Sequence, residues 1–447
     1  MKNVDRSLDP DLVLQPATDK ELVSEDGTLD YKALKELVTS LGADDVGFVN
    51  IDRPSMVQQK RELENIFPAA RSLISIVVRM NREPIRSPAR SVANLEFHNQ
   101  GEEVNLITRK LVAKLERLGI RALNPSMGFP QEMQRFPAKI WVISHKPIAE
   151  AAGLGKMGIN RNVIHPRFGN FILLGTVALD ARISQYDKPI DYNPCIDCKL
   201  CVAACPVGAI APTGEFDFSA CYTHNYREFM GGFTDWVGTI ADSANRGKYE
   251  EKVSASESAS MWQSLAFGPN YKAAYCMSVC PAGEDVIGQF LSSRKDFLED
   301  VVKPLQKKEE ALYVVPGTDA EEYARKRFPH KTIRLVHNSL RPTSIETFIS
   351  GLKSVFQRKI ASDVDINLHF TFTGKEPAIA GVRISKGKLE VSRSHEGIAD
   401  LKVTADSSFW IDFLNRRRSI LMGLLLGKLR LAGSPIHLLS FKKCFPV

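Results

Sequence analysis

The chain has 447 residues, of which 44% are hydrophobic and 25% are charged, an ordinary composition for a folded protein. This length exceeds what a single core supports, so we expect two or three domains. The formal net charge of +7 is modest for the length and does not by itself indicate a nucleic-acid partner. No stretch reaches the roughly eighteen apolar residues of a membrane span, and no signal segment is evident, so a cytoplasmic protein is expected.

After a polar arm at residues 1–29, the chain alternates between helix and strand patterns up to residue 189. Asp30 is a candidate N-cap for a helix that ends at Gly42, and a second helical stripe runs from Val104 to Leu118. The apolar runs that predict strands are Val46–Val49, Leu73–Val78, Ile140–Ile143 and Phe171–Leu179. Residues 30–189 are therefore expected to form an α/β or α+β domain.

Residues 190–295 contain seven of the eight cysteines. Disulfides are rare in a reducing compartment, so these cysteines are interpreted as metal ligands. The following segment, 296–330, is highly charged and is expected to be a solvated connector with little core of its own.

Residues 331–447 show the pattern of a third, α+β unit. A helix is expected around Ile345–Phe356, and Lys386 with Gly387 is expected to form a hairpin turn. The strands predicted from alternation are Ile366–Phe372, Val382–Ser385, Lys388–Val391 and Asp400–Thr404.

The central cysteine run, CxxCxxCxxxCP from Cys195 to Pro206, has ferredoxin-type spacing. Two-residue spacers wrap the backbone around one corner of a cubane, so that three thiolates reach three irons while nearby amides face the sulfurs. In two-cluster ferredoxins the fourth cysteine of the run ligates the other cluster, and a remote Cys-Pro pair completes the first. Such a pair is present at Cys280.

The sequence therefore predicts two iron–sulfur clusters. The first is assigned Cys195, Cys198, Cys201 and Cys280, and the second is assigned Cys205, Cys221 and Cys276. The alternative is structural zinc, which normally uses two separated ligand pairs rather than a run of four cysteines.

The second cluster lacks one cysteine. Ala273 stands three residues before Cys276, where another cysteine would complete a second motif. We expect either a 3Fe-4S form or a 4Fe-4S cluster with a non-cysteine ligand. Cys444 is a further candidate ligand, although a lone cysteine is more often a packed thiol.

A second signature precedes the cysteines, reading HKPIAEAAGLG from His145 and HPRFG from His165 to Gly169. With the cluster run, it resembles the cobalamin-dependent epoxyqueuosine reductase and reductive dehalogenase superfamily over about residues 30–295. The resemblance implies a nitroreductase-like domain that holds a corrinoid beside a ferredoxin-like unit with two clusters. The residues it implies for corrinoid contact are Ala152, Gly153, Leu154, Gly155, Gly158, His165, Phe168 and Gly169. A glycine turn needed only for close packing is the alternative.

The chain departs from this superfamily in two respects. Epoxyqueuosine reductases have an acidic proton donor upstream of the glycine stretch, but Pro137–Pro147 contains no Asp or Glu. No twin-arginine export signal is present either. Activity on tRNA and membrane-linked halide respiration are therefore not expected. His145 is the candidate proton donor, and a packing or hydrogen-bonding role is its alternative.

The C-terminal unit carries FTFTG from Phe370, ADLKVT from Ala399 and MGLLLGKLRLAG from Met422. These segments, with Gly387-Lys388-Leu389, resemble a sterol-carrier-protein domain. The resemblance implies a curved sheet under helices that enclose an apolar tunnel for a lipid-like ligand. The candidate lining residues are Phe409, Trp410, Phe413, Leu414, Leu421, Leu424 and Leu425, with an ordinary core as the alternative.

Together these features predict an iron–sulfur oxidoreductase that depends on cobalamin and acts on an unidentified, apolar substrate. The expected partner is a low-potential electron donor such as ferredoxin or flavodoxin, and neither nucleic acid nor a membrane span is expected. The alternatives are a non-catalytic electron-transfer protein with a lipid-binding domain, and a scaffold whose clusters are structural.

Overall fold

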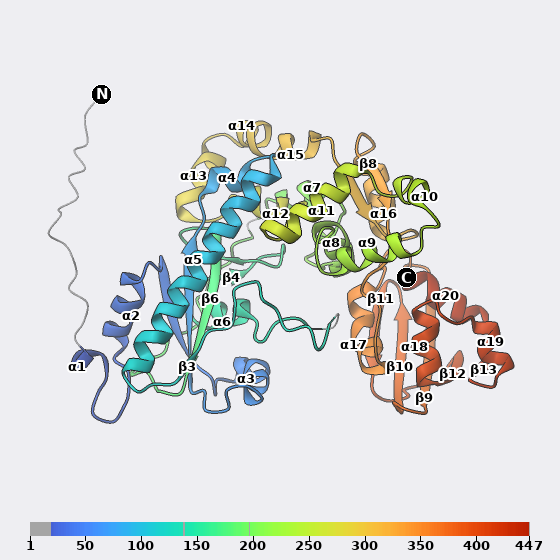
Figure 1. The fold of residues 1–447 in the computed structure, drawn as a ribbon, viewed down its shortest axis with the longest axis horizontal. Coiled ribbons are helices and arrows are strands. Elements are labelled where there is room, and N and C mark those ends of the chain that lie inside the picture. Colours follow the sequence, from blue (N-terminus) through green and yellow to red (C-terminus); the bar gives the residue numbers. More distant parts are fainter. Residues whose placement is uncertain (1–18, 137–138, 196, 447) are drawn as a thin grey trace.

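The computed structural model describes residues 19–136, 139–195 and 197–446 (Figure 1). Most of the predicted arm lies outside these ranges. Its described end includes a short helix, α1 (Asp19–Leu22), and both Leu22 and Leu29 are buried in the first core. This end of the predicted polar arm is therefore packed against the first domain.

The first domain is a four-stranded antiparallel sheet in the order β1-β2-β6-β3, covered on both faces (Figure 1). Its strands are β1 (Asp45–Asn50), β2 (Ser72–Arg79), β3 (Ala122–Leu123) and β6 (Ile172–Leu179), with a separate hairpin of β4 (Lys156–Met157) and β5 (Val163–Ile164). Its helices are α2 (Tyr31–Ser40), α3 (Val57–Glu64), α4 (Arg82–Arg86), α5 (Arg90–Arg117) and α6 (His145–Ala151). The domain is thus α+β, one of the two expected classes.

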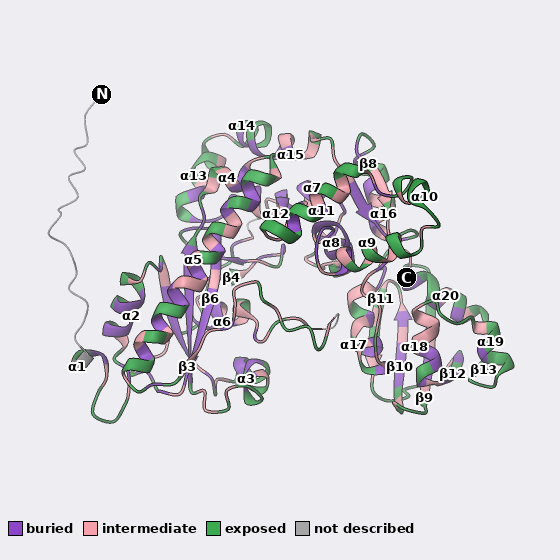
Figure 2. Cartoon of the chain, in the orientation of Figure 1, coloured by how far each residue is buried: buried purple, intermediate pink, exposed green. Residues whose placement is uncertain are grey.

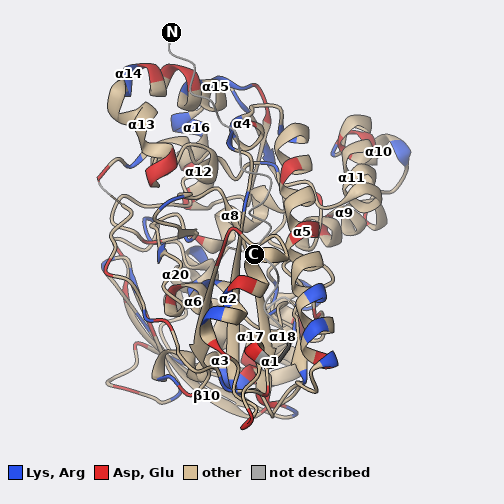
Figure 3. Ribbon diagram, turned by 90° about the vertical axis from the view of Figure 1, so that its left-hand side faces the viewer, with Lys and Arg blue, Asp and Glu red and all other residues tan. Residues whose placement is uncertain are grey.

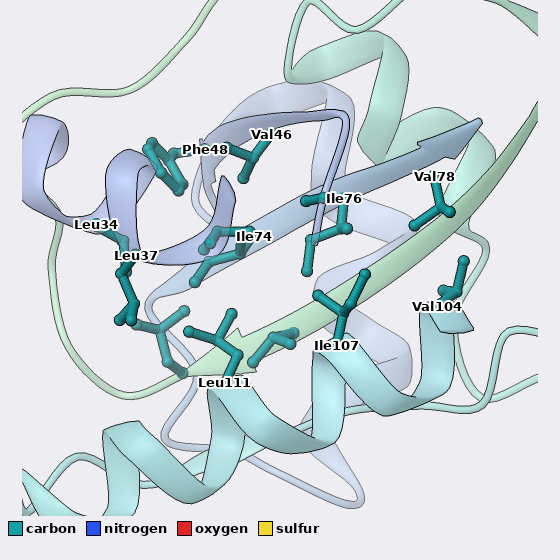
Figure 4. Packing of buried hydrophobic residues seen from close by; sticks show 14 of the residues in the cluster. Leu34, Leu37, Val46, Phe48, Ile74, Ile76, Val78, Val104, Ile107 and Leu111 are labelled. Carbon is teal, nitrogen blue, oxygen red and sulfur yellow. The ribbon is translucent and has the colours of Figure 1, made fainter. Parts of the chain in front are cut away.

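Helices α2 and α5 cover one face of this sheet, while α3 and α6 cover the other. Val104, Ile107 and Leu111 on α5 are fully buried against the sheet (Figure 4). Each such side chain contributes roughly 1.5–3 kcal/mol through its removal from water. Asp30 caps α2 as predicted, because its carboxylate accepts hydrogen bonds from the N–H groups of Lys32 and Ala33.

The predicted strand at Ile140–Ile143 is wrong, because these residues lie in an irregular segment before α6. Ile143 is nevertheless buried in the core beneath α6. A short apolar run can fill a core without pairing to a strand, which explains the error.

The cysteine-bearing unit is mostly helical. Its helices are α7 (Leu200–Ala204), α8 (Phe218–Asn225), α9 (Gly231–Ala241), α10 (Arg246–Glu250), α11 (Ala255–Phe267), α12 (Tyr275–Ser278), α13 (Glu284–Ser292), α14 (Arg294–Phe297), α15 (Lys303–Lys307) and α16 (Asp319–Arg327). A π-helical turn lies at Leu298–Val302, and β7 (Ala311–Val314) pairs in parallel with β8 (Thr332–Leu335).

Residues 296–330 are not a solvated connector. Phe297 and Leu305 are completely buried in a cluster with Leu200 and Tyr275, which flank the cysteines. The following strand and α16 pack against Cys201 and Cys205 in another cluster. The charged residues of this segment thus cover a core that belongs to the cysteine-bearing unit.

The C-terminal domain is a five-stranded sheet in the order β11-β10-β9-β12-β13. The strands are β9 (Asp365–Thr373), β10 (Ala378–Ser385), β11 (Lys388–Ser392), β12 (Leu401–Asp406) and β13 (Leu429–Gly433), and only the β9–β12 pair is parallel. The helices are α17 (Ile345–Val355), α18 (Ser407–Leu414), α19 (Ile420–Leu425) and α20 (Ile436–Cys444). The four predicted strands and the helix around Ile345–Phe356 are confirmed.

The expected hairpin turn is confirmed as well, since Lys386 and Gly387 have φ angles of +48° and +70°. Trp410 is buried among Phe348, Phe370 and Phe372 in the domain core. By contrast, Leu421 and Leu425 of the predicted tunnel are exposed at the surface, on α19. Among the described residues, none of the helices combines the length and apolar character that crossing a bilayer requires.

Candidate iron–sulfur centre

Four predicted ligands from two distant stretches of chain line one cavity. Cys195, Cys198 and Cys201 come from the loop before α7 and its first turn, and Cys280 follows α12. The cavity has an empty volume of about 400 Å³, which includes the solvent at its opening. This is the set of thiols assigned to the first cluster.

The remaining three predicted ligands lie beside this set. Cys205 ends α7, Cys221 is on α8 and Cys276 is on α12, and the three thiols influence one another electrostatically. Cys201 is influenced by both Cys276 and Cys280, so the two sets are neighbours. Cys444 is completely buried in the C-terminal core, which agrees with a packed thiol.

Backbone N–H groups face the sulfurs in both sets. The N–H of Ile159 donates to Cys195 Sγ, and the N–H of Ala209 donates to Cys205 Sγ, each at 3.3 Å. Burial, reinforced by the neighbouring thiols, raises the pKa of Cys280 and of Cys276 to about 12. Thiols crowded in this way ionise readily only when a cation neutralises them, which is what bound iron does.

The two cysteine stretches have the same local geometry. Lys199 and Ala274 both have left-handed φ angles, +51° and +57°, and each lies two residues before a cysteine on the first turn of a helix. Each helix then leads to a Cys-Pro pair. Superimposing this repeat in register places Ala273 where Cys198 stands in the first stretch. The sequence analysis identified the missing ligand but not the repeat of backbone geometry.

Two arginines approach the centre, Arg86 from α4, which is buried, and Arg90 from α5, which is partly exposed. Arg86 lies over the rings of Phe171 and Phe297, at 5.5 and 5.2 Å, and Arg90 lies 5.4 Å from the ring centroid of Tyr275. Within the described residues, Nε of both arginines and Nη2 of Arg86 have no hydrogen-bond partner.

The arginines are also coupled to the cysteines. Burial lowers the pKa of Arg86 to about 10 and also lowers the pKa of Arg90, while thiolates at Cys280 and Cys276 favour the charged forms of Arg86 and Arg90 respectively. These cations were not identified from the sequence, because nothing in the spacing of Arg86 or Arg90 indicates contact with residues about 190 positions away.

The residues of the glycine-rich segment pack closely against neighbouring parts of the chain. Ala152, Leu154 and Phe168 belong to the core beneath α6. A Cβ at Gly153 or Gly155 would lie 2.5 Å from a backbone carbonyl oxygen, that of Lys188 or Ile164. A Cβ at Gly158 would lie 2.6 Å from the Ile164 side chain. This packing is what the close-packing alternative expects of these glycines, and their contact with a corrinoid stays a prediction.

The HPRFG motif fixes the loop that carries Cys280. The N–H groups of Glu284 and Asp285 donate to the carbonyls of Pro166 and Arg167, at 2.8 and 3.0 Å. A Cβ at Gly169 would lie 1.9 Å from the Ala282 carbonyl oxygen. The contact is thus close enough to require a glycine.

His165, the first residue of this motif, makes hydrogen bonds that hold the motif in place. Its Nε2–H donates to Asp45 Oδ2 at 3.0 Å, while Nδ1 accepts the N–H groups of Arg167 and Phe168. Both ring nitrogens are therefore occupied, and the HPRFG motif holds the loop that carries Cys280.

His145 is likewise engaged at both ring nitrogens. Its Nδ1 contacts Thr176 Oγ1 at 2.8 Å and its Nε2 contacts the Ser126 carbonyl at 3.1 Å. Burial lowers the pKa of His145, so the neutral form predominates at neutral pH. The hydrogen-bonding role is the one this geometry supports.

Comparison with known proteins agrees with the cysteine chemistry. Residues 188–211 match the 4Fe-4S binding domain. The epoxyqueuosine reductase of Bacillus cereus is 24% identical, with 43% of this chain and 56% of that protein covered. The enzyme of Staphylococcus aureus is 26% identical with the same coverage. A solved catabolic reductive dehalogenase overlaps 43% of this chain and 29% of its own, at 21% identity and a TM-score of 0.35.

The chain is therefore an iron–sulfur protein. Its similarity to the epoxyqueuosine reductases, predicted from the motifs, is confirmed, and the chain spans about half the length of the relatives it matches. The nitroreductase-like and sterol-carrier resemblances stay predictions.

Proposed function

We propose that the protein is an iron–sulfur-dependent reductase with two clusters held by the seven central cysteines. The observation that carries the proposal is the single cavity lined by Cys195, Cys198, Cys201 and Cys280. Its four thiols match the ligand number of a cubane. The relatives named as reductases support an oxidoreductase, and a low-potential donor such as ferredoxin or flavodoxin is the proposed partner.

The donor set fits iron–sulfur clusters in charge as well as number. Bound clusters supply one-electron transfer, and their negative charge increases on reduction. The N–H groups of Ile159 and Ala209 stabilise that charge at the sulfurs. The unpartnered guanidinium nitrogens of Arg86 and Arg90 add buried positive charge on the side of Cys280 and Cys276.

The second cluster is proposed to be held by three cysteines. Ala273 replaces the ligand that its counterpart Cys198 supplies in the first stretch, and Ala273 is buried, with its N–H bonded to Asn225 Oδ1 at 3.0 Å. One iron of a cubane at Cys205, Cys221 and Cys276 would thus lack a cysteine ligand, so either a three-iron form or a non-cysteine ligand completes this site.

A corrinoid fits the described residues poorly. The eight residues predicted to contact it pack against the protein's own core and backbone, and both nitrogens of the proposed proton donor His145 are occupied. Cobalamin dependence is still a prediction from the resemblance alone. Two other expectations also stay predictions: that the C-terminal domain binds an apolar substrate, and that the protein has no nucleic-acid partner. We assign no reaction step to a corrinoid.

The test is metal content of protein purified without oxygen, with Cys198→Ser as the variant and Cys444→Ala as the matched control. We expect the visible absorption to bleach with dithionite, and Cys198→Ser to lose iron from one cluster while Cys444→Ala keeps its iron. Equal iron in both variants would disprove the ligand assignment. Clusters that accept no electrons from dithionite or ferredoxin would instead indicate a structural role. Cobalt measured in the same samples tests the corrinoid prediction separately.

A further inference from the structure

The positive charge of the chain is concentrated at its C-terminal end. Residues 413–447 contain seven Lys and Arg and no Asp or Glu, whereas the rest of the chain has as many basic residues as its 52 acidic ones. Figure 3 shows the two signs interspersed over the side of the molecule it faces. The net charge of +7 thus resides in this end, which indicates an anionic partner.

The same end exposes large apolar side chains. On α19 and just after it, Leu421, Leu425 and Leu426 are 72%, 86% and 61% exposed, in the region coloured mostly green in Figure 2. The helix is held to the domain by Gly423, where a Cβ would lie 2.4 Å from the Phe409 ring. This anchoring keeps the leucines facing outward.

Basic residues flank these leucines on both sides. Arg416, Arg417 and Arg418 precede α19, and Lys428 and Arg430 follow it. Two of these cations pair with carboxylates, Arg417 with Asp412 at 3.5 Å and Lys428 with Asp406 at 3.4 Å. The surface therefore combines outward leucines with a cationic border, and we call it the α19 surface.

We propose that the α19 surface, Arg416–Arg418 with Leu421, Leu425, Leu426, Lys428 and Arg430, docks onto anionic lipid bilayers. A bilayer offers both features at once, because its acyl boundary accepts the leucines and its headgroups attract the arginines and lysines. RNA fits less well, since it is bound through aromatic stacking and polar contacts, and the α19 surface has no aromatic side chain. The proposal is independent of the iron–sulfur function.

The test is co-sedimentation of the full, cluster-loaded protein with vesicles. Vesicles of phosphatidylcholine alone are compared with vesicles that also contain phosphatidylglycerol, each at low and high salt. We expect binding only to the anionic vesicles and a marked loss at high salt. Leu421→Ser combined with Leu425→Ser should reduce the partition coefficient at least tenfold, with unchanged thermal unfolding because both side chains are exposed.

Ile398→Ser is the matched control, since Ile398 is 94% exposed in the same domain but outside the α19 surface. It should bind vesicles like the unmodified protein. Absence of binding to anionic vesicles would overturn the proposal, and so would equal binding by the double variant. Concentration-dependent dimerisation abolished by the double variant, without any vesicle binding, would show that the surface is a contact between two copies.

Discussion

Replacing Gly169 by alanine tests whether the HPRFG motif positions Cys280. A Cβ there would lie 1.9 Å from the Ala282 carbonyl oxygen, whereas real Cβ atoms keep at least 3.0 Å. The loop carrying Ala282 must therefore move by about 1 Å, and displacing packed backbone costs roughly 1–3 kcal/mol. Because Ala282 follows Cys280 and Pro281 directly, the displacement moves a cluster ligand.

Backbone strain adds to this cost. Gly169 has φ = +65°, and a residue with a Cβ pays roughly 1–2 kcal/mol in that region. Alanine also lowers the conformational entropy of the unfolded chain, which stabilises the folded protein by less than about 1 kcal/mol. The net destabilisation is about 1–5 kcal/mol, a large part of the roughly 5–15 kcal/mol that stabilises a domain.

Gly119→Ala is the control, because Gly119 has φ = +79° with no atom within 4 Å of the added Cβ. Alanine at position 119 therefore has the same backbone strain, but its Cβ displaces no neighbouring atom. Iron, sulfide and thermal unfolding would be measured on both variants after anaerobic purification. We expect Gly169→Ala to lose about half of its iron, that of the Cys280 cluster, and Gly119→Ala to retain all of it. Equal iron content and equal unfolding temperatures would refute the reasoning.

Three further changes test other parts of the site. Ala273→Cys should change the electron paramagnetic resonance of the second cluster, and it should add about one iron per chain where that cluster is the three-iron form; an unchanged spectrum would argue against the repeat. Arg90→Gln should lower the reduction potential of the cluster near Cys276, by roughly 59 mV for each 1.4 kcal/mol of lost stabilisation, and an unchanged potential in a redox titration would count against this role. Burial raises the pKa of Asp217, the N-cap of the helix carrying Cys221, to about 6. The folded protein then binds this proton more tightly, so stability falls as pH rises from about 4 to 6; Asp217→Asn keeps the cap and should flatten that slope in denaturant titrations, whereas an unchanged slope would contradict the assignment.

The cysteine grouping could be predicted because metal chemistry fixes it. The spacing of the run and the remote Cys-Pro pair determine which thiols can share a cubane, and Cys280 indeed lines a cavity with Cys195, Cys198 and Cys201. The strands of the C-terminal domain were equally predictable, since β9 alternates buried and partly exposed side chains over most of its length.

Other features could not be predicted from residue type alone. A glycine that accommodates a ligand and a glycine that accommodates a carbonyl, such as Gly169 against Ala282, look the same in sequence. The burial of Phe297 and Leu305 could not be predicted from the charged composition after residue 296, because a few buried side chains are enough to pack short helices against a core. The leucines of α19 resembled core residues by their spacing, yet Leu425 is 86% exposed.

The most direct test of the central claim is the metal and sulfide content of the protein purified without oxygen. The account predicts a brown protein with about seven or eight irons and about eight acid-labile sulfides per chain, and absorption that bleaches on reduction. Colourless protein, or zinc bound by the cysteines without sulfide, would contradict it.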